Sequence, residues 1–413
     1  MNFREAEQYL LSLGNEVLAM KLGLENVSKL LEALGNPQNE YLKVQVAGTN
    51  GKGSVCAFLD SICREAGIKC GVTTSPHLVS MTERVRIAGR DISEPDFAGL
   101  ATRVRETSED LVSDGELESV PTYFEQIIAI ALLAFAEAGV ELAILETGLG
   151  GRLDATTAAK AEICAITRID FDHQKILGET IEEIAAEKAA LIRSDSTVVV
   201  GEQKPEAMEV ISRRCANVGV RPKLAVQIDP AFEDLSLGFP GRHQIENAKI
   251  AVLLAEVLGE QFSITRRNIV AGLKKARHPG RLEFVGDFLL DGAHNLGGAN
   301  ALRSFLEESV ERPITMVFGA MRDKDVSEIA STLFPLAGRV VLTKADNPRC
   351  FEPAELARSV PDEVASEIHL SDNVAEALRI AKEMTPDDGL VVVTGSLYLV
   401  GEARKILAAE SQI

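Results

Sequence analysis

The chain has 413 residues, of which 46% are hydrophobic and 25% are charged, so it is long enough for two globular domains with well-buried cores. Its 62 acidic and 43 basic residues give a net charge of −19. Binding to nucleic-acid phosphates needs a basic face, so this balance argues against a general nucleic-acid-binding protein. Small anions could still bind at local basic clusters.

The beginning of the chain and its apolar runs predict a cytoplasmic protein that does not enter a membrane. The first residues, MNFREAEQYL, carry charges where the apolar region of a signal peptide would begin. The longest apolar run, residues 127–136, is too short to span a bilayer and predicts a buried helix. The six cysteines include no CxxC pair, which favours core packing in a reducing compartment over disulfides or metal binding.

The first candidate site is the glycine-rich segment VAGTNGKGS, residues 46–54, between a predicted strand (41–46) and a predicted helix. Such a loop can bind phosphate through backbone N–H groups, a cation and a hydroxyl group. These are supplied by Gly48, Thr49, Asn50, Gly51, Lys52, Gly53 and Ser54. The match to GxxxxGK[ST] is imperfect, because Val46 stands at the first glycine position and Gly53 separates Lys52 from Ser54.

Beyond this loop, apolar segments alternate with helical segments, a rhythm that predicts an α/β protein with open, mostly parallel sheets. The predicted buried strands are residues 140–147, 161–167, 196–202, 313–320, 339–345 and 390–396, with a further strand at EFVGDFLL, residues 283–290. A basic Pro/Gly stretch at 274–281 is the best domain boundary. We therefore expect a P-loop-type domain over residues 1–280, with helices flanking a mostly parallel sheet, and a smaller Rossmann-like domain over 281–413.

Polar residues at the ends of predicted strands mark the expected ligand side of each domain. Glu146 ends one strand beside the phosphate loop, where a carboxylate could hold Mg²⁺. Asp291 and His294 follow a strand of the second domain. The segment GLGGR, residues 148–152, shortly after Glu146, could indicate dinucleotide binding, but it lacks the GxGxxG spacing. A cleft between the two domains is the expected ligand site.

Two further residues lie in the stretch 168–193. A lone histidine such as His173 is more often structural than a ligand. Lys188 is unusual because Ile184, Ala185, Leu191 and Ile192 put it on the apolar side of a predicted helix. A lysine there must extend its amine to solvent, be paired, lose its proton or be modified, and the first is the default on spacing alone.

Taken together, the motifs resemble one family, the folylpolyglutamate synthase and dihydrofolate synthase branch of the Mur-type ligases. They occur in the family's order as GTNGKGS, TSPHL, ISEPDF, PTYFE, ETGLGGRLDAT, DHQKILGETIEEIAAEKAALIR, GRHQIENA, HPGR, DGAHN, GAMRDKD and TGSLYLVGEAR. The resemblance implies a monomeric ATP-dependent ligase that joins L-glutamate to folate or dihydropteroate through an acyl phosphate. Residues 1–280 then correspond to the ATP-binding domain and 281–413 to the glutamate ligase domain.

The resemblance also implies roles for single residues. Lys52, His173 and Lys188 are expected to be catalytic, and Lys188 to be carried as a carbamate. Two Mg²⁺ ions are expected, and their expected protein ligands are Ser54, Glu146 and His173. Nucleotide contacts beyond the loop are expected from Asn247, Arg281, Asp291 and His294, and substrate contacts from Ser75, His77, Thr122, Phe124 and Asp154. By itself, PTYFE also predicts a helix start capped by Thr122.

The sequence departs from the family pattern at two places. The family usually has DATN where residues 154–157 are DATT, and commonly an aromatic residue where His278 precedes PGR. Both leave the substrate preference open.

Two other functions remain possible. A cell-wall Mur ligase would need a further N-terminal domain, for which a phosphate loop at residue 46 leaves little room. A regulatory ATPase would lack ligase activity.

Overall fold

The computed structural model describes residues 1–14, 23–225, 235–360 and 367–410. The chain divides into two compact units. The first comprises residues 1–238 and 246–276, and the second comprises residues 239–245 and 277–413. The division after residue 276 lies within the stretch 274–281, and the second unit also includes residues 239–245, which extend into the first turn of helix α9 (Arg242–Leu258). None of the described helices is both long and apolar enough to cross a bilayer.

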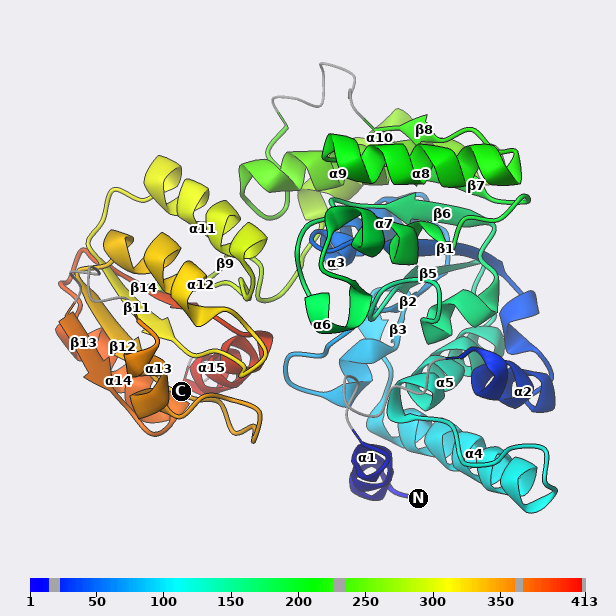
Figure 1. The fold of residues 1–413 in the computed structure, drawn as a ribbon, viewed down its shortest axis with the longest axis horizontal. Helices are drawn as coiled ribbons and strands as arrows, with labels where there is room; N and C mark the ends of the chain where they lie inside the picture. Colours follow the sequence, from blue (N-terminus) through cyan, green and yellow to red (C-terminus); the bar gives the residue numbers. More distant parts are fainter. Residues whose placement is uncertain (15–22, 226–234, 361–366, 411–413) are drawn as a thin grey trace. The chain divides into compact units, whose positions relative to one another are not determined.

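The first unit is built on an eight-stranded sheet in the order β4-β3-β2-β5-β1-β6-β7-β8, in which β2, β5, β1, β6, β7 and β8 run parallel (Figure 1). The strands are β1 Leu42–Ala47, β2 Cys70–Thr73, β3 Arg86–Ile87, β4 Arg90–Asp91, β5 Leu142–Glu146, β6 Ile163–Ile166, β7 Thr197–Val200 and β8 Lys223–Leu224. The central strands are buried along their length, as consecutive apolar residues require in a sheet covered on both faces.

Helices cover both faces of this sheet. Helix α5 packs on Ala143 and Leu145, and α7 and α8 pack on the same face through Ala47 and Cys164, while α3 packs against β1, β2 and β5. The helices are α1 Phe3–Ser12, α2 Glu25–Ala33, α3 Lys52–Glu65, α4 Glu94–Ser113, α5 Tyr123–Ala138, α6 Gln174–Leu177, α7 Ile181–Ala189, α8 Pro205–Val218, α9 Arg242–Leu258 and α10 Arg266–Lys275, with 3₁₀ turns η1 Pro37–Asn39, η2 Met81–Arg84 and η3 Ala155–Ala159.

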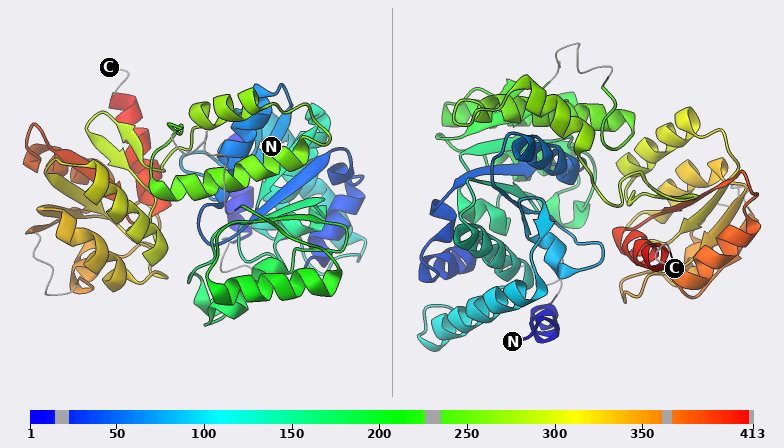
Figure 2. Two further views of the ribbon diagram at one scale, coloured as in Figure 1. Left: turned by 90° about the horizontal axis from the view of Figure 1, so that it is seen from above. Right: turned by 180° about the vertical axis from the view of Figure 1, so that it is seen from behind.

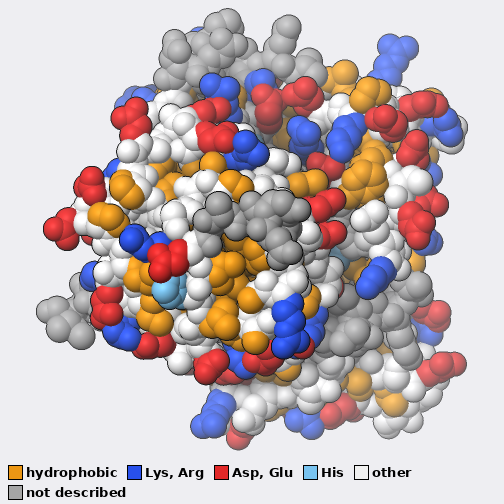
Figure 3. All heavy atoms as spheres, turned by 60° about the vertical axis from the view of Figure 1, so that its left-hand side comes forward, with side chains coloured by type: hydrophobic (Ala, Val, Ile, Leu, Met, Phe, Trp, Pro, Cys, Tyr) orange, Lys and Arg blue, Asp and Glu red, His pale blue; other side chains and the backbone are white. Residues whose placement is uncertain are grey.

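The second unit has a six-stranded sheet in the order β13-β12-β11-β14-β10-β9, parallel except for β9 (Figure 1). Figure 2 shows the ribbon from two further sides. Its strands are β9 Glu283–Val285, β10 Phe288–Leu290, β11 Ile314–Phe318, β12 Arg339–Leu342, β13 Glu367–Leu370 and β14 Leu390–Thr394, and its helices are α11 Leu296–Ser309, α12 Val326–Leu333, η5 Phe334–Leu336, α13 Pro353–Arg358, α14 Val374–Met384 and α15 Leu397–Glu410. Acidic, basic and hydrophobic side chains are interspersed over the face in Figure 3.

The prediction of α/β architecture with mostly parallel sheets is confirmed, but one predicted strand is wrong. Residues 283–290 form an antiparallel hairpin, β9 and β10, instead of a single strand. The turn falls at Gly286, whose φ of 58° is easily adopted by glycine, and Asp287. All six cysteines are free and buried.

Candidate functional site

The predicted phosphate loop connects the C-terminal end of β1 to the first residue of α3, Lys52. The N–H groups of Thr49 and Asn50 donate to the carbonyl of Arg168, at 2.9 and 3.2 Å, so the loop is tied to the chain that leaves β6. The hydroxyl of Thr167 donates to the carbonyl of Asn50 at 2.7 Å. Hydrogen bonds to residues 167 and 168 therefore fix the backbone of the loop.

Two glycines of the loop leave no space for a side chain. A Cβ on Gly48 would collide with the Thr167 hydroxyl, and a Cβ on Gly51 would collide with the amide of Asn247. Both have positive φ, 153° and 90°. Gly51 thus brings the start of α3 against Asn247, a buried residue of α9 that was predicted to contact the nucleotide. A bare backbone before a helix N-terminus is what an anion-binding loop requires.

Lys52 and Lys188 meet at this loop. The Lys52 amine donates to the carbonyls of Gly48 and Thr49, at 3.1 and 3.2 Å, and the Lys188 amine donates to the carbonyl of Gly48 at 2.9 Å. Lys188 comes from α7 and is 4% exposed. The default interpretation, in which it extends to solvent, is wrong, because its amine is buried at the loop.

The environment of Lys188 favours the neutral amine. Burial, followed by the charge of Lys52, lowers the pKa of Lys188 to about 7, and the carboxylates of Asp172 and Asp154 oppose the shift. A desolvated ammonium is costly, and a second cation adds repulsion. Near neutral pH a large fraction of Lys188 is therefore uncharged and nucleophilic.

The predicted metal ligands include two buried oxygen donors. Ser54 lies in the first turn of α3. Glu146 is the last residue of β5, and it pairs with Val46 of the neighbouring strand β1. Glu146 accepts a hydrogen bond from the N–H of Ser75 at 3.2 Å. Among the described residues no three His, Cys, Asp or Glu side chains form a cage for a metal ion. One carboxylate and a hydroxyl fit Mg²⁺, which commonly completes its octahedron with water and substrate phosphates.

His173 lies just before α6, in the left-handed conformation with φ of 50°. Its backbone N–H donates to Asp172 at 2.9 Å, and its Nε2 is 3.8 Å from the same carboxylate. The neighbouring Asp172 was not predicted, although it also influences Lys188. Its only signal in the sequence is its position directly before the histidine.

The predicted substrate residues occur on three segments of the first unit. Ser75 and His77 lie after β2, where Arg84 donates to His77 Nδ1 at 2.8 Å. Thr122 caps α5 in a capping box with Glu125, as the helix-start interpretation predicts. The ring of Phe124 packs so closely on Gly148 that a Cβ there would be 2.6 Å from it.

Asp154 is buried, and its carboxylate accepts hydrogen bonds from Leu149 N at 2.9 Å and from Thr156 N at 3.0 Å. Burial raises the pKa of Asp154, and these hydrogen bonds oppose the shift. Thr157 stands where the family usually has asparagine. Its hydroxyl donates to Gly151 O at 2.7 Å and accepts from Gln45 Nε2 at 2.8 Å. The DATT segment thus shapes the GLGG loop.

The remaining predicted nucleotide residues belong to the second unit. Asp291, at the end of β10, accepts from the N–H groups of Leu282 and Ala293, at 2.9 and 3.0 Å, and burial raises its pKa. Arg281 and His294 both donate to the carbonyl of Gly292, at 3.3 and 2.8 Å. The three side chains therefore converge on one short segment, 291–293.

The sequence analysis missed His243, which also belongs to the second unit. Burial and the charge of Arg281 lower the pKa of His243 to about 4, so it is neutral at physiological pH. His278, where the family has an aromatic residue, keeps a ring contact: its centroid lies 5.9 Å from that of Phe239 at an interplanar angle of 74°. An imidazole therefore takes over part of the aromatic packing.

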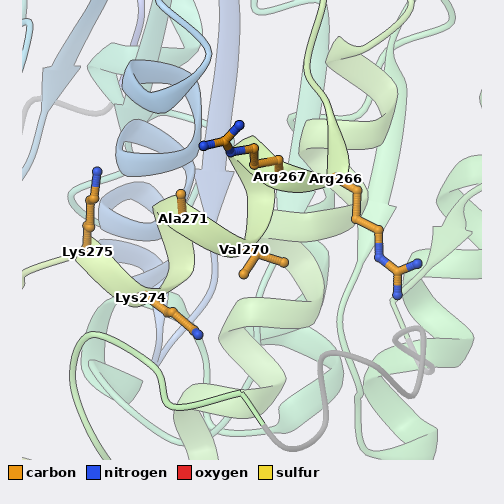
Figure 4. Close-up of a pocket in the computed structure, with 6 residues that line it drawn as sticks. All are labelled: Arg266, Arg267, Val270, Ala271, Lys274 and Lys275. Carbon is orange, nitrogen blue, oxygen red and sulfur yellow. The ribbon is translucent and has the colours of Figure 1, made fainter.

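A hollow of about 560 Å³ lies elsewhere in the first unit, along α10 (Figure 4). Its lining consists of Arg266, Arg267, Val270, Ala271, Lys274 and Lys275. It has an apolar floor between cationic side chains, and it holds none of the predicted site residues. Lys52, Lys188 and Asn247 lie instead at the loop 48–51.

Both units match models of known protein families. Residues 46–229 match the model of the Mur ligase middle domain, and residues 280–397 match that of the Mur ligase glutamate ligase domain. The chain is 33% identical to the dihydrofolate synthase/folylpolyglutamate synthase of Bacillus subtilis, over 95% of this chain and 97% of that protein. It is 36% identical to a probable bifunctional folylpolyglutamate synthase/dihydropteroate synthase of Haloferax volcanii, but spans only 50% of that protein's length.

Solved structures give the same result. The fold matches Mycobacterium tuberculosis folylpolyglutamate synthase complexed with ADP and AMPPCP, with a TM-score of 0.90 and 29% identity over 98% of each chain. It also matches Escherichia coli FolC in complex with DHPP and ADP, with a TM-score of 0.87 and 29% identity over 100% of this chain and 99% of that one. The chain therefore belongs to the folylpolyglutamate synthase and dihydrofolate synthase family of the Mur ligases.

Proposed function

We propose that this protein is an ATP-dependent ligase that joins the amino group of L-glutamate to the carboxylate of a folate-type acceptor. The observation that carries the proposal is the meeting of Lys52 and Lys188 at the Gly48 carbonyl, in a glycine loop of a chain from this ligase family. The acceptors are the glutamate tail of a reduced folate, dihydropteroate, or both.

The reaction has two covalent steps. A carboxylate oxygen of the acceptor attacks the γ-phosphorus of ATP, and the bond from that phosphorus to ADP breaks, giving an acyl phosphate. The glutamate nitrogen then attacks the acyl carbon, phosphate leaves with its C–O bond electrons, and the nitrogen loses a proton. Lys52 would stabilise the charge on the transferring phosphoryl group, because a fixed cation in a dry site lowers that barrier.

The family's nucleotide and divalent cation fit the residues around the loop. Residues 48–54 would bind the phosphates, together with Asn247, and Arg281, Asp291 and His294 would add nucleotide contacts from the second unit. Ser54, Glu146 and His173 would supply ligands to Mg²⁺, and a modified Lys188 would help to hold a second ion. A bound divalent cation neutralises charge on the phosphates and orients them.

Lys188 is proposed to act as a carbamate. Its neutral amine attacks the carbon of CO₂, an N–C bond forms, and one proton leaves the nitrogen for solvent. The product is an anion, which replaces a costly buried cation with a group that a metal ion stabilises. The lowered pKa of Lys188 supports this proposal, since only the neutral amine reacts.

The proposal is tested by measuring phosphate release from ATP with purified protein. A ligase requires both L-glutamate and an acceptor, and parallel assays with dihydropteroate and tetrahydrofolate identify which acceptor is used. Phosphate release without either substrate would point to a regulatory ATPase instead. Release that needs a different amino acid and a nucleotide-sugar acceptor would point to a cell-wall Mur ligase.

A further inference from the structure

One buried guanidinium connects two of the segments that were predicted to bind the substrate. Arg84, the last residue of η2, is 2% exposed. Its Nε donates to Nδ1 of His77, in the TSPHL segment, at 2.8 Å. Its guanidinium carbon lies 5.4 Å from the ring centroid of Tyr123, in the PTYFE segment. Arg84 therefore contacts both segments.

This contact determines which nitrogen of His77 carries a proton. A guanidinium has only donors and keeps its protons, so Nδ1 must offer its lone pair. The proton of the neutral ring then sits on Nε2. Burial and the charge of Arg84 lower the pKa of His77 to about 3, which keeps the ring neutral throughout the physiological range. Among the described residues His77 makes no second hydrogen bond, so the Nε2–H group is available to a ligand.

The backbone of the same segment is fixed by the residue next to Arg84. The carboxylate of Glu83 accepts from the N–H groups of Leu78, Val79 and Ser80, at 2.8, 2.9 and 2.9 Å. Glu83 therefore fixes the backbone after His77, while Arg84 orients its ring. Two consecutive residues of η2 thus preorganise the segment, which reduces the ordering needed on binding.

We propose that Arg84 is a positioning residue that presents His77 as a neutral Nε2–H donor to a hydrogen-bond acceptor of the folate-type substrate. The proposal rests on the proposed function for the identity of that substrate. An ordinary histidine in this place would change both charge and tautomer near neutral pH. The contact with Arg84 removes that ambiguity, so the site offers one donor of fixed direction.

The test combines spectroscopy with kinetics on the full-length enzyme. In ¹⁵N-histidine NMR spectra from pH 5 to 8, His77 of the wild type should stay neutral with its proton on Nε2. In Arg84→Met, the pKa of His77 should rise, because a cation has been removed, and the tautomers should mix. The KM for the folate-type acceptor should rise about three- to tenfold, the loss expected for one hydrogen bond, while the KM for ATP stays unchanged. Arg86→Met is the control, since Arg86 pairs with Asp91 in the adjoining hairpin.

A second pair of variants keeps the proposal testable if Arg84→Met does not fold. His77→Gln retains an N–H donor and His77→Ala does not, so the acceptor KM should rise more in His77→Ala. A wild-type His77 protonated on Nδ1, or titrating near its ordinary pKa, would overturn the proposal, as would equal acceptor KM values in wild type and both His77 variants. The spectra need no turnover, so they test the tautomer even if the wild type shows no glutamate-dependent phosphate release.

Discussion

The amines of Lys52 and Lys188 donate to the same acceptor, the carbonyl oxygen of Gly48, at 3.1 and 2.9 Å. Two ammonium groups in one place repel each other, and the more buried one loses its proton more readily. Burial, and after it the charge of Lys52, lowers the pKa of Lys188 to about 7. One lysine can thus serve as a cation for phosphate while the other supplies a neutral amine for CO₂.

Lys52→Ala should abolish acyl-phosphate formation and leave the fold intact, because the variant removes the proposed phosphate cation from a part-buried position. It should also raise the pKa of Lys188, since a neighbouring positive charge is gone. Phosphate release measures the loss of activity, and a thermal unfolding curve measures whether the fold is intact. Lys175→Ala, at an exposed lysine of α6, serves as the control. Near-normal turnover of Lys52→Ala with a normal melting temperature would exclude the proposed role.

Active, Mg²⁺-loaded protein should carry a carbamate on Lys188, detected by ¹³CO₂ labelling or as extra electron density on the amine. Lys188→Ala should lose activity and recover part of it with a small added carboxylate. Lys188→Arg should also be inactive, because a guanidinium keeps its charge and cannot form the carbamate. An unmodified amine in a fully active sample would rule out the modification.

Lys188→Met should stabilise the protein even though it removes activity. The folded-state pKa of about 7 lies below the usual value of 10.5, so the unfolded chain binds more protons between these values. The free-energy cost of burying the Lys188 amine in the folded protein is therefore largest at and below pH 7, and it disappears as the pH rises toward 10.5. In CO₂-free buffer we expect a gain of about 1–4 kcal/mol in the free energy of unfolding at pH 6, and a smaller gain at pH 9.

Denaturant unfolding at the two pH values measures this difference. Lys382→Met is the matched control, because Lys382 is an exposed lysine on helix α14 and its loss should leave stability nearly unchanged at both. A Lys188→Met variant that is destabilised at pH 6 would show that the buried amine contributes favourably, contrary to this argument.

The parts of the fold that the sequence predicts are those with a local signal. Consecutive apolar residues indicate the buried parallel strands, and the neighbours of Lys188 at helical spacing place it on the apolar side of a helix, although they did not predict that its amine is buried. The contact between Lys188 and Gly48 joins residues 140 positions apart, and periodicity cannot reveal it. Periodicity also cannot reveal the hydrogen bond from Thr167 to the carbonyl of Asn50 in the loop. The hairpin at 283–290 was missed because its two short strands and the intervening Gly286 fit a single apolar run.

Gly51→Ala should weaken nucleotide binding and destabilise the protein by about 1–3 kcal/mol, because a Cβ would collide with Asn247 and the residue has φ of 90°. Gly67→Ala is a matched control, since Gly67 follows the same helix with φ of 80° but nothing lies within 4 Å of its Cβ position. Nucleotide titrations and melting curves of the two variants separate the collision from backbone strain. Equal losses in both would mean that the close approach to Asn247 has no consequence.

Arg281→Ala should raise the apparent ATP requirement or slow turnover, by about 2–4 kcal/mol, as for removal of one group that stabilises transition-state charge. In the second unit Arg281 donates to Gly292, and its charge opposes the raised pKa of Asp291. The variant should therefore raise the pKa of Asp291 as well, which argues for measuring ATP dependence at two pH values. Arg303→Ala is the control, because Arg303 forms an exposed ion pair with Glu307 one turn away on α11. An ATP dependence that is the same in wild type and Arg281→Ala would mean that this arginine makes no nucleotide contact, and the proposed nucleotide site would then rest on the loop 48–54 and Asn247.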